Sequence, residues 1–241
     1  VSASIGLMLE TTSRLLLEPG MPHHGCPDKD PDVRLEVLER AGRQRIPFTT
    51  GLLVGIGDTR RDRVDGLLRI RDLHKKHGHI QEVIIQNFVP KENTAMRGVA
   101  PATLDEMRFT VAACRLLMPE QNVQVPPNLS EDWTALIDAG CNDFGGISPV
   151  TPDYVSPEKS WPSLVSLSET VSRANKTLLP RACIYPSYIQ EYDTYTEWLS
   201  FARKASPLSS VLRAVDGDGY LRASAWYAGK TSETAGEEDR T

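Results

Sequence analysis

The sequence predicts an α/β protein in which parallel strands alternate with helices and form either a barrel or a doubly wound sheet. Two observations favour this class. Short apolar runs rich in Val, Ile and Leu recur along residues 5–147, and longer amphipathic stretches separate them. Helix-capping signals also open or close several of these stretches. The order of elements is therefore expected to be βαβαβαβαβα.

The first strand is expected at residues 5–10, which form a short apolar run. A helix should follow at residues 32–45, because Asp30 and Pro31 before it are cap and first-turn signals. The apolar run at residues 49–55 then predicts the second strand. This succession is the first βαβ unit.

The second helix is expected at residues 62–76, where apolar side chains recur at helical spacing. Gly78 lies just past its end, as a helix-terminating glycine would. Residues 82–88, rich in Val and Ile, predict the third strand. The same alternation of strand and helix is thus repeated.

A long helix is expected at residues 103–118, where Thr103 and Glu106 have the spacing of a capping box. A strand at residues 122–125 and a helix at 130–139, with Ser130 as its cap, are expected next. A strand at 143–147 and a helix at 164–174 should follow. The last two expected elements are a weaker strand at 181–185 and a helix at 195–204.

Two regions are expected along the chain. Residues 1–205 carry the strand and helix pattern, whereas residues 206–241 are polar and predict a disordered tail or linker. A complete eight-stranded barrel takes about 250 residues. Because these residues supply only five clear strands and begin without Met, we expect the N-terminal strands of the barrel to be encoded upstream.

Composition excludes several classes of function. The formal net charge is -5 and the basic residues are dispersed, so nucleic acid is not an expected partner. No apolar run approaches the roughly 20 residues that span a bilayer. We therefore expect a globular protein in the cytoplasm, without membrane contact.

The cysteines are scattered, which predicts reduced thiols rather than a disulfide framework or a metal-binding loop: Cys26, Cys114, Cys141 and Cys183. One short segment contains residue types that bind zinc, namely His23, His24 and Cys26. These residues are too close together for a structural zinc site, so an ordinary loop is expected. No metal ligands are therefore assigned to this chain.

Three histidines near a helix end are expected to be structural: His74, His77 and His79.

The second expected strand, which contains Gly51, runs into a Gly-x-Gly turn at Gly55-Ile56-Gly57. Glycine lets a flat ligand approach the backbone, because no Cβ is in the way. The same pattern also occurs in an ordinary tight turn, with Asp58 or Thr59 as the cap of the next helix. Pattern alone leaves both interpretations open.

Six sequence blocks resemble the radical S-adenosylmethionine (SAM) barrel enzymes, and most closely the deazaflavin (FO) synthases among them. They occur in order over residues 6–162, with short gaps. The blocks are Gly6-Leu-Met-Leu-Glu10, Cys26-Pro-Asp-Lys-Asp-Pro31, Arg45-Ile-Pro-Phe-Thr-Thr-Gly-Leu-Leu-Val-Gly55-Ile-Gly, Gln81-Glu-Val-Ile-Ile-Gln-Asn-Phe88, Pro126-Pro-Asn-Leu129 and Gly145-Gly-Ile-Ser-Pro-Val-Thr-Pro-Asp153. The resemblance implies part of a TIM-type (β/α) barrel.

The resemblance also implies a SAM site. Glu10 matches the acidic residue that would accept hydrogen bonds from the SAM ribose, and Arg34 matches an arginine that would pair with the SAM carboxylate. The remaining residues implied at this site lie along the second strand and would contact adenine: Gly51, Val54, Gly55, Ile56 and Gly57. Asp58 departs from the family, where Glu is usual.

On the substrate side, amides suited to a uracil-like ring and other polar residues follow the later strands. The implied substrate-binding residues are Gln86, Asn87, Asn128, Asp143 and Ser148, with Thr151 and Asp153 as weaker candidates. No catalytic residue is assigned.

The reaction implied by the resemblance needs SAM and a [4Fe–4S] cluster, whose cysteine loop we expect upstream of this chain. Cleavage of SAM would give a 5′-deoxyadenosyl radical. This radical would act on a hydroxybenzyl adduct of ribityl-diaminouracil, and ring closure with loss of ammonia would form the deazaflavin of coenzyme F-420. A companion synthase half, fused or separate, is the implied partner.

Two alternatives remain open. The chain could be a non-catalytic fragment or pseudo-enzyme, because it lacks the cluster loop, and it is expected to be inactive by itself. It could also belong to a SAM barrel with a different substrate, such as a menaquinone-pathway or biotin-type synthase. The blocks at residues 27–31 and 126–128 argue against a different substrate.

Overall fold

The computed structural model describes residues 4–130, 132–148, 150–190 and 214–222. It contains twelve elements: β1 (Ile5–Gly6), η1 (Arg14–Leu17), η2 (Pro27–Lys29), α1 (Pro31–Arg43), β2 (Phe48–Val54), α2 (Arg60–His77), β3 (Ile80–Asn87), α3 (Leu104–Leu117), β4 (Val123–Gln124), α4 (Trp133–Asp138), α5 (Leu164–Arg173) and α6 (Pro186–Gln190). The chain divides into two compact units, Ser4–Leu178 and a second that contains Leu179–Thr241 with the first three residues.

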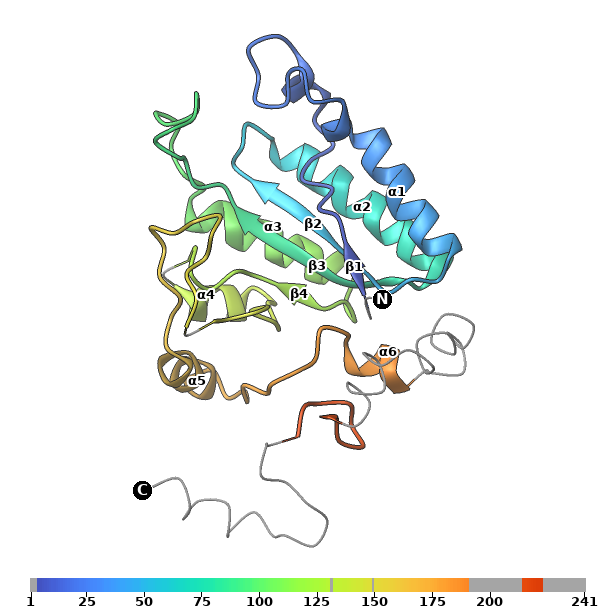
Figure 1. Ribbon diagram of the computed structural model, residues 1–241, viewed down its shortest axis with the longest axis vertical. Helices are drawn as coiled ribbons and strands as arrows, with labels where there is room; N and C mark the ends of the chain where they lie inside the picture. The colour runs from blue at the N-terminus through green and yellow to red at the C-terminus, as the bar shows by residue number, and fades with distance from the viewer. Residues whose placement is uncertain (1–3, 131, 149, 191–213, 223–241) are drawn as a thin grey trace, which may run out of the picture. The chain divides into compact units, whose positions relative to one another are not determined.

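The larger unit is built on a parallel sheet with the strand order β1-β2-β3-β4. Figure 1 shows these strands side by side, with α1, α2 and α3 lined up along the sheet. The predicted α/β class with a parallel sheet is therefore confirmed. Within the described residues the sheet stays open, because β1 and β4 end the strand order and do not pair with each other.

The core lies on the face of the sheet that the helices cover. Alternate residues of β2 and β3, such as Leu52 and Ile85, are fully buried there against Leu67 of α2 and Val111 of α3. Leu53 of β2, and Ile84 and Gln86 of β3, lie between such residues in sequence and are only partly buried. Because successive side chains of a strand point to opposite faces, the second face of the sheet is the more open one.

The predicted caps fix where the first two helices begin. The Asp30 side chain accepts a hydrogen bond from the Asp32 backbone N–H at 2.9 Å, with Pro31 in the first turn of α1. Thr59 and Asp62 form a reciprocal capping box at the start of α2. Gly78, in the left-handed region at φ 68°, ends α2 as expected.

Two caps differ from the prediction. Thr103 caps α3, but the Glu106 carboxylate binds Arg60 at 2.7 Å and also Arg63, instead of returning to the Thr103 backbone. The helix α4 is capped by Asp132 and not by Ser130. The Ser130 carbonyl instead accepts a hydrogen bond from the Trp133 indole at 2.8 Å, which holds Ser130 in the preceding turn.

Three predicted strands are shorter or absent. The first ends at Gly6, and the chain returns to β2 only at an isolated bridge between Glu10 and Leu52. Asp143 forms only an isolated bridge with Gln124. Residues 181–185 form no strand. The expected helix at 195–204 lies outside the described residues.

The second unit contains α6 and an antiparallel bridge between Val215 and Leu221. The Arg181 guanidinium lies 4.1 Å from the centre of the Tyr185 ring, an interaction between a cation and an aromatic face. The predicted boundary near residue 205 falls outside the described residues, so the division into a barrel part and a polar tail stays a prediction.

Candidate functional site

Glu10 forms a bridge with Leu52, near the C-terminal end of β2. The segments that follow β2 and β3 emerge at this end of the sheet (Figure 1). The Glu10 backbone N–H donates to the Gly51 carbonyl at 2.9 Å, and its own carbonyl accepts from the Leu53 N–H at 2.8 Å. Its φ of 65° is unusual for a residue other than glycine. Neighbouring β2 thus fixes the position of Glu10 despite an unfavourable backbone conformation, a combination common at binding sites.

A buried ion pair joins Glu10 to Arg34, whose side chains are 14% and 6% exposed. Glu10 Oε1 accepts hydrogen bonds from Arg34 Nη1 at 2.9 Å and from Lys29 Nζ at 2.5 Å. Arg34 also donates to the Met8 carbonyl at 2.5 Å and to the Asp28 carbonyl at 2.8 Å. The two residues predicted for SAM therefore meet, but protein groups already occupy most donors of Arg34.

His23 also belongs to this site, although the sequence indicates it only as a potential metal ligand. Its side chain is buried beside Glu10, with Nε2 3.4 Å from Glu10 Oε2. Neither ring nitrogen has a hydrogen-bond partner. Burial lowers the pKa of His23, and the charges of Lys29 and Arg34 lower it further, against the opposing effect of Glu10. The imidazole is therefore neutral near pH 7.

The three predicted glycines have close neighbours within the protein. A Cβ on Gly51 would lie 2.0 Å from the Ile84 carbonyl oxygen of β3. Gly55 and Gly57 have φ of 93° and 116°, and a Cβ on them would lie 3.0 Å from Ala102 and 3.1 Å from Leu16. The fold itself requires glycine here, so these positions alone do not indicate a ligand.

Asp58 holds the turn that contains Gly55 and Gly57. Its Oδ1 accepts a hydrogen bond from the Gly55 N–H at 2.7 Å, and its other oxygen binds Arg63. Arg63 in turn binds Glu106 of α3. Thr59, rather than Asp58, caps α2. The Asp58 side chain, which is shorter than the Glu usual in the family, therefore makes its hydrogen bonds within and next to the turn.

Val54 and Ile56 have different surroundings. Val54 is fully buried in the main core, which leaves it no surface for adenine in this conformation. Ile56 belongs to a separate apolar cluster beyond the end of β2, together with Leu16, Phe88, Met21, Leu53 and Met96. We call this cluster the apolar wall. A contact of either residue with a ligand stays a prediction.

The Glu10 site has the chemistry that a ribose requires. Glu10 Oε2 and the buried His23 ring have no other hydrogen-bonding partner in the described residues. The apolar wall supplies the kind of surface on which a flat ring packs. The residues present therefore fit SAM.

An iron–sulfur cluster does not fit the described residues. Burial raises the pKa of Cys114 and of Cys141 to about 12, so both thiols stay protonated. Within the described ranges, no group of three His, Cys, Asp or Glu side chains lies close enough to hold a metal ion.

The substrate-side residues of β3 face opposite directions. Gln86 pairs in register with Leu53, which places it on the open face of the sheet, whereas Asn87 pairs with the core residue Val54. Asn87 Nδ2 donates to the Leu129 carbonyl at 2.6 Å, while its Oδ1 is buried without a partner. Of the two, Gln86 is better placed to meet a ligand.

Asn128 links the loop after β4 to the loop at residues 150–160. Its Nδ2 donates to Asp153 Oδ2 at 2.8 Å, and its Oδ1 is buried without a partner. Burial raises the pKa of Asp153, but hydrogen bonds from Asn128 and from the Val155 and Ser156 backbones lower it more, so the group is ionised. Asn128 is thereby held in one orientation.

Asp143 and Ser148 have local roles in turns. Asp143 Oδ1 accepts a hydrogen bond from the Gly145 N–H at 2.6 Å. Ser148 Oγ accepts from the Thr151 N–H at 3.0 Å and from the Thr151 hydroxyl at 2.7 Å. Their predicted contacts with substrate stay predictions.

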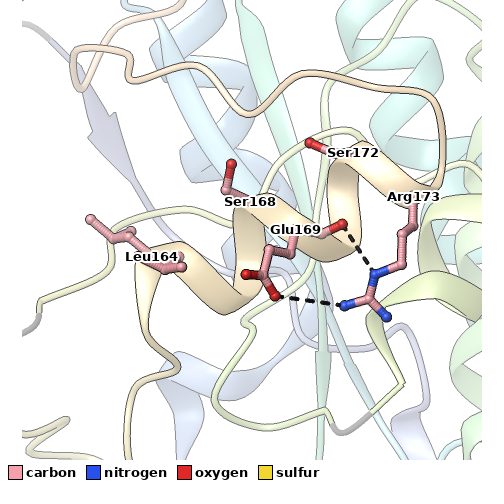
Figure 2. A pocket seen from close by; sticks show the side chains of 6 residues that line it. Leu164, Ser168, Glu169, Ser172 and Arg173 are labelled. Carbon is pink, nitrogen blue, oxygen red and sulfur yellow. Dashed lines mark hydrogen bonds and ion pairs between the residues drawn. The ribbon is translucent and has the colours of Figure 1, made fainter. Parts of the chain in front are cut away.

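One cavity of about 750 Å³ lies along α5, away from all of these residues. Figure 2 shows that its lining comes from this helix, where Arg173 donates to the Glu169 carbonyl at 3.3 Å. Leu164 and Val165 are its exposed apolar residues. A surface lined by one helix, with its charges already paired, lacks the converging polar groups of a small-molecule site.

Among the residues that the structure describes, no helix is both long and apolar enough to cross a membrane.

Comparison with known proteins identifies related sequences. No family model matches the chain. An FO synthase of Nocardia farcinica is 51% identical over 194 residues, which cover 79% of this chain and 22% of that protein. The 7,8-didemethyl-8-hydroxy-5-deazariboflavin synthase of Methanoregula boonei is 50% identical over 190 residues, covering 78% of this chain and 55% of its own length. The chain thus spans between a fifth and about half of these relatives.

Among solved structures, HydG, a maturase of the [FeFe]-hydrogenase, has a similar fold. The TM-score is 0.60 at 21% sequence identity, over 78% of this chain and 42% of HydG. This likeness agrees with the parallel α/β architecture.

Proposed function

Because this chain is homologous to FO synthases over about four fifths of its length, we propose that it forms SAM-binding and substrate-binding walls of a radical SAM FO synthase. The proposed reaction closes a ring, with loss of ammonia, on the hydroxybenzyl adduct of a ribityl-diaminouracil and yields a deazaflavin. The observation that carries the proposal is the buried cluster of Glu10, Arg34 and His23 at the end of the parallel sheet, where α/β barrels build their sites.

In this proposal Glu10 accepts hydrogen bonds from ribose hydroxyls. Arg34 and Lys29 hold its carboxylate in place by hydrogen bonds, which prepares an acceptor before the ligand arrives. The apolar wall around Ile56 packs against the adenine and keeps water from that side. Bound SAM, together with an iron–sulfur cluster, would supply the one-electron chemistry. We assign the cluster ligands to residues outside this chain, since its cysteines are dispersed.

For the substrate, Gln86 is the residue that the geometry favours. It lies on the open face of β3, and its amide offers both a donor and an acceptor to a uracil ring. Asn128, fixed by Asp153, lies in the loop after β4.

A longer relative leaves room for a fused companion domain, which we propose as the partner. A cytoplasmic location is part of the same proposal and is supported by the four free cysteines.

A product assay tests the proposal. The full-length gene product, purified without oxygen and loaded with its cluster, is given SAM, a reductant and the hydroxybenzyl adduct, and the deazaflavin is identified by mass and fluorescence. We expect product from the wild type and at least tenfold less from Glu10→Gln. Gly98→Ala, a change in an open surface loop, serves as the matched control. Wild-type protein that cleaves SAM but forms no deazaflavin would exclude this substrate.

A further inference from the structure

His23 is the one member of the cluster with Glu10 and Arg34 to which the proposed function gives no individual role. It is 4% exposed, and both ring nitrogens are buried without a hydrogen bond. Buried polar groups in native proteins are nearly always paired, and an exception indicates a water, an ion or a ligand that completes the site. The position beside Glu10 makes a ligand of the Glu10 site the relevant completion.

The backbone around His23 holds the ring in this position. The His23 N–H donates to the Leu16 carbonyl at 2.9 Å, and its own carbonyl accepts from the Cys26 N–H at 3.1 Å. Leu16 itself is fully buried in the apolar wall. The segment between η1 and η2 is therefore anchored on both sides of His23.

Hydrogen-bonding chemistry restricts what can sit between His23 and Glu10. Glu10 Oε1 is occupied by Arg34 and Lys29, so Oε2 is the acceptor left for a ligand. An ionised carboxylate only accepts, and the neutral imidazole can present Nε2–H as a donor. A hydroxyl group both donates and accepts, so a single hydroxyl satisfies the two groups together.

We propose that His23 and Glu10 bind one ribose hydroxyl of SAM between them, with His23 Nε2–H donating to the hydroxyl oxygen and Glu10 Oε2 accepting its hydrogen. This inference rests on the proposed SAM site and adds a specificity-determining residue to it. Nε2 and Oε2 lie 3.4 Å apart without hydrogen-bond geometry, so one hydroxyl oxygen lying beside the pair can be within hydrogen-bond distance of both. The lowered pKa of His23 supports a neutral ring there.

Binding measurements on the full-length protein test this. Equilibrium dialysis gives the affinities of S-adenosylhomocysteine and of its 2′-deoxy and 3′-deoxy analogues for wild type, His23→Leu and His23→Gln. In the wild type, removal of the bridged hydroxyl should weaken binding about 5- to 10-fold. In His23→Leu the same removal should cost clearly less than in the wild type, because the hydrogen bond from His23 is already gone and only the one to Glu10 is lost. His23→Gln, whose amide can reach the position of Nε2, should restore most of the difference.

The neighbouring His24 provides the control, since its ring is exposed and only approaches the Leu17 carbonyl. His24→Leu should show the wild-type response to both deoxy analogues. Equal losses in wild type and His23→Leu for both analogues would overturn the inference, because a water molecule would then satisfy His23. Wild-type protein that binds neither SAM nor S-adenosylhomocysteine would instead refute the proposed function itself.

Discussion

At the scale of single residues, the structure changes the interpretation of Arg34. Its match to a SAM-binding arginine came from sequence, but its donors reach Met8, Asp28 and Glu10 within the protein. A buried arginine with these partners supports the fold as well as the site. No sequence pattern shows this, because the partners are two backbone carbonyls and a residue from a distant segment.

The first prediction follows from this burial. Arg34→Ala should lower the free energy of unfolding by about 3 kcal/mol, because the change removes one of the two cationic partners of the Glu10 carboxylate and leaves the Met8 carbonyl without a donor. Urea denaturation followed by circular dichroism measures it. Arg14→Ala, which removes exposed ion pairs to Asp30 and Asp32, should change stability by less than about 0.5 kcal/mol. Equal stability of the Arg34 and Arg14 variants would contradict this structural role.

His79 gives the second prediction, on pH. It is fully buried and donates from Nε2 to the Leu38 carbonyl at 2.8 Å, and burial lowers its pKa from 6.5 to about 4. Between these two values the unfolded chain binds a proton that the folded chain does not. His79 therefore costs stability as pH falls from 6.5 to 4, by up to about 3 kcal/mol.

The variant His79→Gln isolates this effect, because its amide can keep the bond to Leu38 but does not titrate. Unfolding midpoints of wild type and variant are compared from pH 7.5 to pH 4.5. The wild type should lose stability more steeply below pH 6.5. Parallel curves would show that His79 is protonated in the folded protein.

At the scale of elements, local signals in the sequence determine most of the fold. Asp30, Thr59 and Gly78 act as the predicted helix ends, since capping depends on a few adjacent residues. The short β1, the bridge at Asp143 and the absent strand at 181–185 could not be predicted this way. Strand length depends on hydrogen bonds to a neighbouring strand, which apolar runs do not reveal.

Gly51 shows how two elements constrain one residue, and gives the third prediction. Gly51→Ala should destabilise the protein by about 3 kcal/mol or force β2 away from β3, because its Cβ would meet the Ile84 carbonyl at 2.0 Å. The control Gly98→Ala has no neighbour within 4 Å and should stay within about 0.5 kcal/mol of wild type. A Gly51→Ala protein of wild-type stability and SAM affinity would show that this close approach does not exist.

At the scale of the whole molecule, the sheet of the described residues is open at β1 and β4. Strand edges and an incompletely covered sheet face favour association with other chains. We therefore predict that residues 1–241 expressed alone will aggregate or form dimers, and that they will neither hold a cluster nor cleave SAM. A monomeric, cooperatively unfolding species in analytical ultracentrifugation and calorimetry would contradict this.

For the site, too, sequence patterns indicate some residues, whereas others are recognised only in the folded chain. The family resemblance indicated Glu10, Arg34 and the turn at 55–57, and the structure joins Glu10 to Arg34 and to β2. His23 was recognisable only from its burial without partners, which is a property of the folded chain. The core position of Val54 likewise depends on the strand register.

The central claim is that the end of the sheet beside Glu10 binds SAM in an FO synthase. Hydrogen–deuterium exchange of the full-length protein, with and without S-adenosylhomocysteine, tests it most directly. We expect slower exchange at residues 8–10, 21–26 and 51–57, with α5 unchanged. Protection that leaves these three segments unaffected, in protein shown by dialysis to bind the ligand, would contradict the claim.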